Sequence, residues 1–288
     1  MRKGKTYLLM LLLLAGGGPA IGQDINFSQF YELPLLRNPA LAGIFSGDIR
    51  ATAVYRNQWE SVTVPYRTFG LGLEYKKSMG MNSDDFVTLG LQATNDVAGD
   101  SKLSRTQLLP VINYHKSINA GGYLSAGIMG GAVFQRFDPS KLSFDDQFVN
   151  GAYSSANPTR QVFKNTSHVY WDISAGLSFS NVAANDIHYY IGAALFHIAR
   201  PKVAFSPQYD ILLNRKLMAN AGLSVPLSDI NKLIIYADYF MQGGNRQGQG
   251  GFMISHDLSQ FEDEKVALSG GLFYRFKDAL VPMVKLDY

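Results

Sequence analysis

Five histidines are the residues of this chain best suited to acid–base or metal chemistry: His115, His168, His188, His197 and His256. None belongs to an HExxH motif or another metal-ligand spacing, and no GxSxG nucleophile motif occurs. His188 or His256 could serve as a base for a serine nucleophile, but scattered Ser and His on strands explain them equally well. The sequence therefore predicts no catalytic residue, no metal site and no cofactor, and it favours a protein that is not an enzyme.

Three other features bear on chemistry. Cysteine is absent, which excludes disulfides, thiolate metal sites and a lipid anchored on cysteine. Asp145 and Asp146 either cap turns or bind a cation, and turn capping is the better-supported alternative. The glycine-rich stretch GGNRQGQGG (243–251) lacks the GK[ST] ending of a phosphate loop, and we expect a flexible outer loop there.

The composition restricts the class of protein. Lys and Arg total 26 against 23 acidic residues, giving a net charge of +3 with no basic cluster, so no nucleic-acid partner is expected. Charged residues are only 17% of the chain, which is low for a soluble domain.

The first residues are typical of an export signal. Arg2, Lys3 and Lys5 precede a short apolar stretch, and Ala20 and Gly22 have the spacing of a cleavage site. A spanning helix needs about 20 apolar residues, and this stretch is shorter. We expect residues 1–22 to be a cleaved signal peptide, residues 23–48 a periplasmic or plug segment, and residues 49–288 a barrel in the outer membrane.

Alternation of apolar and polar residues runs through the chain from about residue 49. In VYWDISAGLSFSN (169–181), one face carries Val169, Trp171 and Ile173 while the other carries Tyr170 and Asp172. A period of two predicts a strand with one apolar face. About twelve such runs occur; the one at 105–116 is less clear, because Leu109 and Val111 fall on its polar face.

We expect the apolar face of these strands to contact lipid rather than a protein core. The runs reach ten residues or more, as membrane strands do. A Lys or Arg facing lipid at mid-membrane depth would cost roughly 2–4 kcal/mol, and charges such as Glu74, Asp172 and Asp238 lie on the opposite face. Aromatic residues near strand ends suit the membrane interface. The fold class predicted is therefore all-β, an antiparallel outer-membrane β-barrel of about 12–14 strands; a secreted β-sandwich is the alternative.

Connection lengths agree with this orientation. If both mature termini lie in the periplasm, the longest connections, roughly 137–167 and 198–215, lie outside, and short connections such as SINAGG lie inside. Long outer loops and short inner turns are typical of outer-membrane barrels.

Several stretches resemble the PorP/SprF family of type IX secretion membrane proteins. These are QDINFSQFYELPLLRNPALAG (23–43), YRNQW (55–59), LSFDDQF (142–148), YYIGAALFHIARPKVAF (189–205) and GGLFYRFKDALVPMVKLDY (270–288). Together they span nearly all of the mature chain.

The resemblance implies an outer-membrane protein of Bacteroidetes that serves type IX secretion or gliding motility. It further implies that the protein assists export and surface anchoring of a secreted adhesin by binding its C-terminal domain, and that it contacts a periplasmic lipoprotein of the machinery. A porin or small-solute transporter is the alternative function.

Eight residues are candidate contacts for a partner or for the plug. Asn38 and Pro39 lie where the chain turns toward the first strand, and Arg56 and Gln58 face the lumen by parity. We expect Arg56 and Gln58 to hold the N-terminal segment, with Asp24 or Glu32 as acceptors, so that this segment plugs the pore. The remaining candidates are Trp59, Asp146, Gln147 and Phe148. Aromatics of the longest loop either bind protein or pack the loop on itself.

Overall fold

The computed structural model describes residues 24–61, 64–80, 84–149, 151–259 and 266–287, and the segment 1–22 predicted to be a signal peptide lies outside them. Twelve strands form one sheet: β1 (Ile49–Gln58), β2 (Tyr66–Ser78), β3 (Phe86–Ala98), β4 (Leu103–Asn119), β5 (Gly122–Arg136), β8 (Ser167–Ala183), β9 (Ile187–Phe196), β10 (Lys216–Pro226), β11 (Asn231–Gln242), β12 (Asn245–Asp257), β13 (Ala267–Arg275) and β14 (Ala279–Asp287). A separate hairpin, β6 (Phe148–Val149) and β7 (Ala152–Tyr153), lies in the longest connection.

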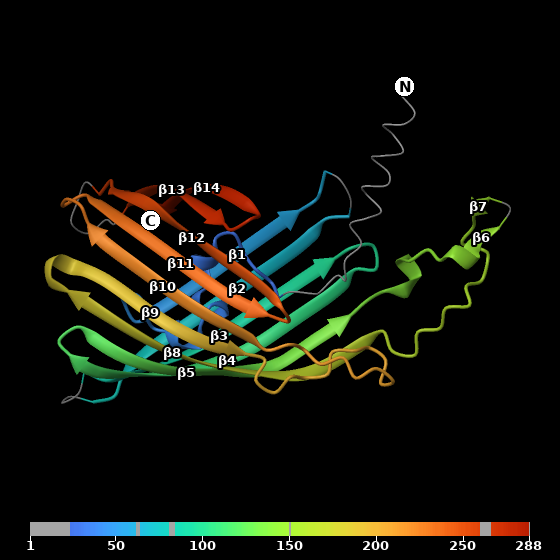
Figure 1. The fold of residues 1–288 in the computed structure, drawn as a ribbon, viewed down its shortest axis with the longest axis horizontal. Helices are drawn as coiled ribbons and strands as arrows, with labels where there is room; N and C mark the ends of the chain where they lie inside the picture. Colours follow the sequence, from blue (N-terminus) through green and yellow to red (C-terminus); the bar gives the residue numbers. More distant parts are fainter. Residues whose placement is uncertain (1–23, 62–63, 81–83, 150, 260–265, 288) are drawn as a thin grey trace, which may run out of the picture.

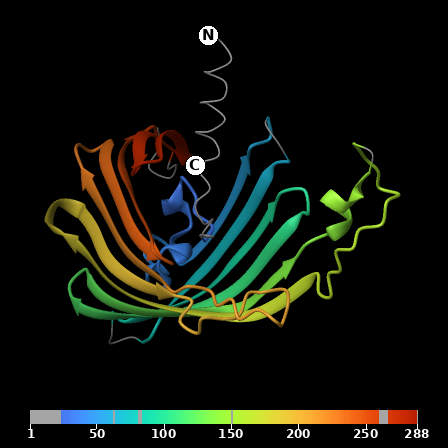
Figure 2. The same cartoon turned by 45° about the vertical axis from the view of Figure 1, so that its right-hand side comes forward.

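Each strand of the large sheet pairs antiparallel with the next one along the chain. The sheet is strongly curled, as Figures 1 and 2 show. This architecture confirms the predicted all-β fold of the outer-membrane barrel type and its strand number. Among the described residues β1 and β14 do not pair with each other, so the curled sheet is open along one seam.

Side chains alternate between the two faces as the sequence predicts. On β8, Trp171 is 73% exposed on the convex face, whereas Asp172 is 5% exposed on the concave face. The predicted inward charges Glu74 and Asp238 are also buried. The concave face therefore forms a lumen, and the convex face presents the apolar surface that lipid would cover. No helix among the described residues is long and apolar enough to cross a membrane.

The two ends of the sheet differ. The long connections 137–166 and 197–215 lie at one end, which we call the loop end, and turns such as 120–121 and 227–230 lie at the other, the turn end. The glycine-rich stretch 243–251 differs from the expected loop: Gly243 and Gly244 form a tight turn with positive φ, and β12 begins at Asn245.

Residues 24–48 precede β1 and lie within the trough that the sheet forms (Figure 2). We call them the N-terminal segment. Short 3-10 turns punctuate it: η1 (Phe30–Glu32), η2 (Pro34–Leu36) and η3 (Pro39–Leu41). Others lie between strands: η4 (Pro139–Lys141), η5 (Asp145–Gln147) and η6 (Ala184–Asp186). Prolines at the first position of η2 and η3 suit these turns, because that N–H has no partner inside the helix.

Candidate functional site

The N-terminal segment fills the middle of the lumen. Leu33, Leu35, Ala40 and Leu41 are each 0–2% exposed. The segment starts at the loop end, where Asp24 contacts one residue of β4 and one directly after β9, and it reaches the turn end, where Ile49 begins β1. The segment therefore forms part of the core that the curled sheet encloses.

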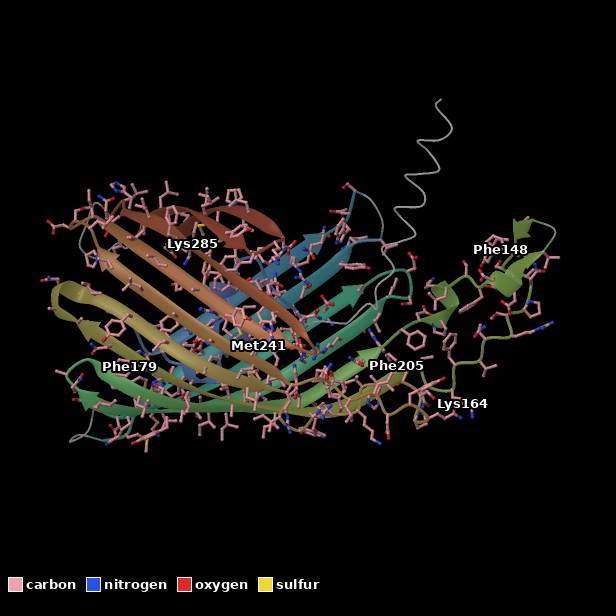
Figure 3. All side chains as sticks on the ribbon, in the orientation of Figure 1. Phe148, Lys164, Phe179, Phe205, Met241 and Lys285 are labelled. Carbon is pink, nitrogen blue, oxygen red and sulfur yellow. The ribbon has the colours of Figure 1, made fainter. Side chains whose placement is uncertain are left out.

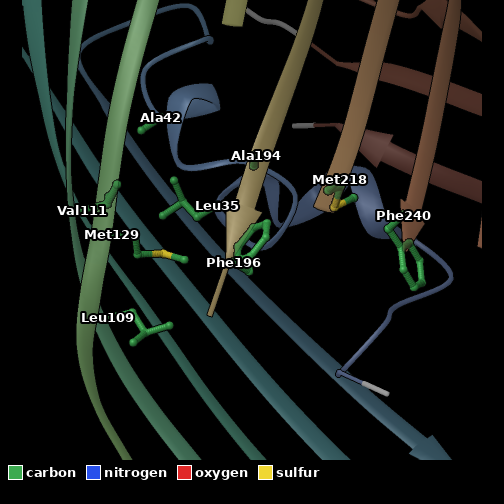
Figure 4. Close-up of a cluster of buried hydrophobic side chains, with 9 residues drawn as sticks. All are labelled: Leu35, Ala42, Leu109, Val111, Met129, Ala194, Phe196, Met218 and Phe240. Atoms are coloured by element: carbon green, nitrogen blue, oxygen red, sulfur yellow. The ribbon is translucent and has the colours of Figure 1, made fainter. Parts of the chain in front are cut away.

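Apolar side chains of the lumen wall receive the middle of this segment. Leu35 and Ala42 pack in a buried cluster with residues of five strands, among them Leu109 and Val111 of β4 (Figure 4). The other members are Met129, Ala194, Phe196, Met218 and Phe240. This packing explains why the apolar–polar alternation at 105–116 is unclear. Leu109 and Val111 face inward, where they contact the N-terminal segment instead of water.

Glycines allow η3 to lie directly against the sheet. A Cβ at Gly127 of β5 would lie 2.6 Å from the backbone carbonyl of Pro39, and one at Gly192 of β9 would lie 2.7 Å from Nδ2 of Asn38. At Gly176 of β8 it would overlap the Asn38 side chain. These three neighbouring strands thus present a floor without side chains, and the backbone of η3 rests on it.

Two buried asparagines fix the segment to that floor. Asn38 Nδ2 donates to the carbonyl oxygens of Leu177 and Ala193, at 3.0 and 3.3 Å, while its Oδ1 accepts from the Ala40 N–H. Asn113 Nδ2 on β4 donates to the carbonyls of Ala40 and Ala42 at 2.9 and 2.8 Å. Since buried carbonyls need partners, these amides make the position of η3 specific.

Arg37 forms a buried ion pair with Asp238 of β11. Its Nη2 lies 2.6 Å from Oδ1, and the two side chains are 4% and 0% exposed. Arg37 Nη1 also donates to the Tyr190 hydroxyl at 2.7 Å, and the guanidinium stacks near the Phe30 and Tyr236 rings. A charge removed from water this completely is stable only when paired, so each partner requires the other.

A second charged cluster holds the start of the segment at the loop end. Asp24 lies 2.8 Å from Arg105 Nη1 and 2.6 Å from His197 Nε2, and His197 Nδ1 lies 2.7 Å from Asp172 Oδ2. Burial disfavours the charge of His197, but Asp24 and Asp172 outweigh it and raise its pKa to about 9. Burial alone would raise the pKa of Asp24, but Arg105 and His197 hold it well below its usual value.

We expect this cluster to make stability depend on pH. Because the pKa of His197 is raised on folding, its contribution is complete below the unfolded value near 6.5 and is lost as pH rises through about 9. From pH 7 to 10, wild type should lose about 2–3 kcal/mol of unfolding free energy that H197Q does not lose. Urea titrations in detergent at both pH values measure this. H188Q is the control, because that side chain is 52% exposed; equal pH slopes for wild type and H197Q would contradict the expectation.

Arg56 holds the segment, at an acceptor other than those expected. Its Nη1 donates to the carbonyl of Asn26 at 2.5 Å, and its Nη2 donates to Thr68 Oγ1 at 2.7 Å. The expected acceptors are engaged elsewhere: Asp24 in the cluster above, and Glu32 with Lys285 of β14 at 3.3 Å. Because the acceptor is a main-chain carbonyl, the residue types alone could not predict this hydrogen bond.

The model of the family described as type IX secretion system membrane protein PorP/SprF matches residues 20–288. The chain belongs to the PorP/SprF family. No curated protein matches it. The match to the PorP/SprF model covers the N-terminal segment as well as the strands.

The remaining candidate residues of this PorP/SprF protein lie outside the lumen or at its rim. Gln58 ends β1, and Trp59 follows with φ of 66° and 59% exposure, at the loop end. Asp146 accepts from Thr159 Oγ1 and the Arg160 N–H, and Gln147 donates to the Asn157 carbonyl. Asp146 and Gln147 thus order the long loop, whereas Phe148 is 55% exposed on the hairpin.

The structure separates the candidates into two groups. Asn38, Pro39 and Arg56 are together at the N-terminal segment, while Asp146, Gln147 and Phe148 belong to a loop that projects away from the sheet (Figure 3). The sequence analysis did not single out Asn113, Arg105 or the glycine floor, and it named Asp238 only as an inward-facing charge. The alternation of residues along the strands predicts that these positions face inward, but it does not predict which residues they contact. No group of His, Asp or Glu in the described part of the chain has a metal-binding arrangement.

Proposed function

We propose that this protein assists type IX secretion in the outer membrane by helping to export a secreted adhesin and anchoring it at the cell surface through the adhesin's C-terminal domain. The lumen filled by the N-terminal segment is the observation that carries this proposal. A diffusion pore needs an open lumen, whereas an anchor needs a rigid frame with binding surfaces at its rim. Buried polar contacts of Asn38, Arg37 and Asn113 hold the segment at a specific position in the lumen.

The hairpin β6–β7 and its surrounding loop form a candidate outer surface for the adhesin. Phe148, Tyr153 and Val162 are 55%, 44% and 82% exposed. Their backbone is ordered by the Asp146 and Gln147 hydrogen bonds, so the aromatics are presented at low entropic cost. Exposed aromatics on an ordered loop are common binding anchors. By its connection lengths this loop end faces outward, toward exported protein.

The turn end would face the periplasm and the rest of the machinery. A cavity of about 530 Å³ opens there beside Phe45 of the N-terminal segment, with Tyr189, Tyr190 and Tyr236 in its wall. A periplasmic lipoprotein is the partner we place on this side. In this reading the protein is not an enzyme, and its export relies on a signal peptide removed after residue 22.

Replacing Phe148 and Tyr153 together by alanine should weaken retention of the adhesin. Hot-spot aromatics contribute about 2 kcal/mol or more, so we expect roughly a thirtyfold loss of affinity. The measurement is co-purification of the adhesin with the protein after mild detergent extraction, quantified against wild type. Tyr209→Ala is the matched control, because Tyr209 is 64% exposed in the other long connection. Unchanged recovery with the double variant would argue against this surface.

Liposome swelling tests the alternative of a porin. Sugar entry should not exceed that of liposomes without protein, because the N-terminal segment occupies the lumen. Rapid sugar entry through wild-type protein, together with failure of any adhesin to co-purify, would replace the anchoring proposal by the transport one.

A further inference from the structure

The two edges of the sheet are β1 and β14, and each pairs on one side only. Among the described residues β1 pairs with β2, and β14 pairs with β13. An unpaired edge presents a row of N–H and C=O groups. In the hydrocarbon of a membrane every such group needs a partner, and open sheet edges facing lipid do not occur.

Outward side chains of both edge strands are well exposed. Ile49 on β1 and Val284 on β14 are 72% and 76% exposed, against 41% for Leu73 on β2 and 49% for Leu89 on β3. All four lie on the outward face.

The N-terminal segment bridges the seam from within. On one side Arg56 of β1 donates to the Asn26 carbonyl, and on the other Glu32 pairs with Lys285 of β14. Between these contacts Phe30 packs in a cluster with Phe273 and Met283. The segment therefore fixes both edges to itself and keeps the lumen side of the seam covered, while the edges stay free to accept another strand.

The described residues offer the seam few further strands. All twelve long strands are placed in the sheet, and β6–β7 lies far from it (Figure 1). Within this described part of the chain, direct pairing of β1 with β14 is the remaining internal solution. Pro282 disfavours it, because it removes one donor in the middle of β14, and proline within sheets is typical of edge strands. The ten residues of β1, IRATAVYRNQ, contain no proline, so β1 is the better template.

We propose that the edge of β1 binds a β-strand from the C-terminal domain of the exported adhesin. This deepens, and rests on, the proposed anchoring function, because it states how the cargo is held. Main-chain hydrogen bonds would supply the affinity, as in other cases of strand addition. The bound strand should alternate apolar residues, which continue the lipid-facing surface of Ile49, Ala53 and Tyr55, with small or polar residues over Thr52 and Arg56.

The absence of cysteine makes a cross-linking test direct. Cysteine replaces Ala53 on the outward face of β1 and, in a second set, is combined with cysteine at Pro282, Val284 or Leu286 of β14. Two positive controls come from the observed register: Ala53 with Leu71, and Val284 with Gly270, are Cα partners. The pairs are treated with a short thiol cross-linker in outer membranes. A benzophenone on A53C is photolysed in the complex with the co-purified adhesin.

We expect an adduct between position 53 and the C-terminal domain of that adhesin, control pairs that cross-link, and no link from position 53 to β14. A strong link from position 53 to β14 in the adhesin complex would overturn the inference, because the sheet would close on itself. A link between two copies of A53C would overturn it in favour of a dimer. Adhesin that co-purifies but gives adducts only from a benzophenone at position 148 would overturn strand addition and leave the anchoring function standing. If no adhesin co-purifies, the anchoring function fails and the inference with it.

Discussion

Replacing Asp238 by alanine should lower the free energy of unfolding by about 3–5 kcal/mol, among the largest effects of any single substitution in this chain. The substitution leaves the Arg37 guanidinium charged, with a side chain only 4% exposed, in a lumen where water cannot replace the lost carboxylate. Tyr190 remains as a hydrogen-bond acceptor for Nη1, but Nε and Nη2 both lose their partner. Because Arg37 belongs to the N-terminal segment, the loss should loosen the segment as well as the sheet.

Urea titration in detergent micelles, followed by tryptophan fluorescence, measures the effect. Asp210→Ala is the matched control: its pair with Lys202 is exposed by 76% and 65%, so its removal should change stability by less than about 0.5 kcal/mol. The double variant R37M/D238L should recover most of the loss, because apolar side chains of similar size can replace a buried pair. A D238A variant no less stable than D210A would show that Arg37 finds water in the lumen.

Period-two alternation predicted most of this fold because the two faces of each strand meet different solvents. Trp171 and Asp172 are adjacent in sequence, yet one is exposed on the convex face and the other is buried in the lumen. The alternation became unclear where the lumen is not wet. Leu109 and Val111 face inward against Leu35, so their apolar character reports the N-terminal segment and not lipid.

The pairings that make the site could not be predicted from residue types. Arg37 and Asp238 are 201 positions apart, and their contact depends on how the N-terminal segment crosses the lumen. Arg56 was expected to find a carboxylate and instead binds the carbonyl of Asn26. The open seam is a property of backbone hydrogen bonds at β1 and β14, which strand periodicity does not determine. Sequence thus predicted the orientation of side chains but not which of them meet.

Gly127→Val should displace η3 from its floor and open the lumen. The first added carbon would lie 2.6 Å from the Pro39 carbonyl and 2.7 Å from the Ala40 nitrogen. Contacts below 3 Å with backbone cannot be relieved by rotating a side chain, so the N-terminal segment must move. β5 itself should persist, since valine is favoured in strands. When η3 lifts, the side-chain amides of Asn38 and Asn113 lose their carbonyl partners together, at a cost of about 1–3 kcal/mol for each unsatisfied group.

Single-channel recording in planar bilayers is the measurement for this variant. Wild type should give few openings, and Gly127→Val should give frequent, long-lived ones as the segment leaves the lumen. Gly270→Val is the control: Gly270 lies in β13, a Cβ there meets nothing within 4 Å, and it should behave as wild type. If Gly127→Val folded normally and stayed closed, η3 could not be what blocks conduction. If wild type conducted as strongly as the variant, the filled lumen could not be the resting state of the protein in a membrane.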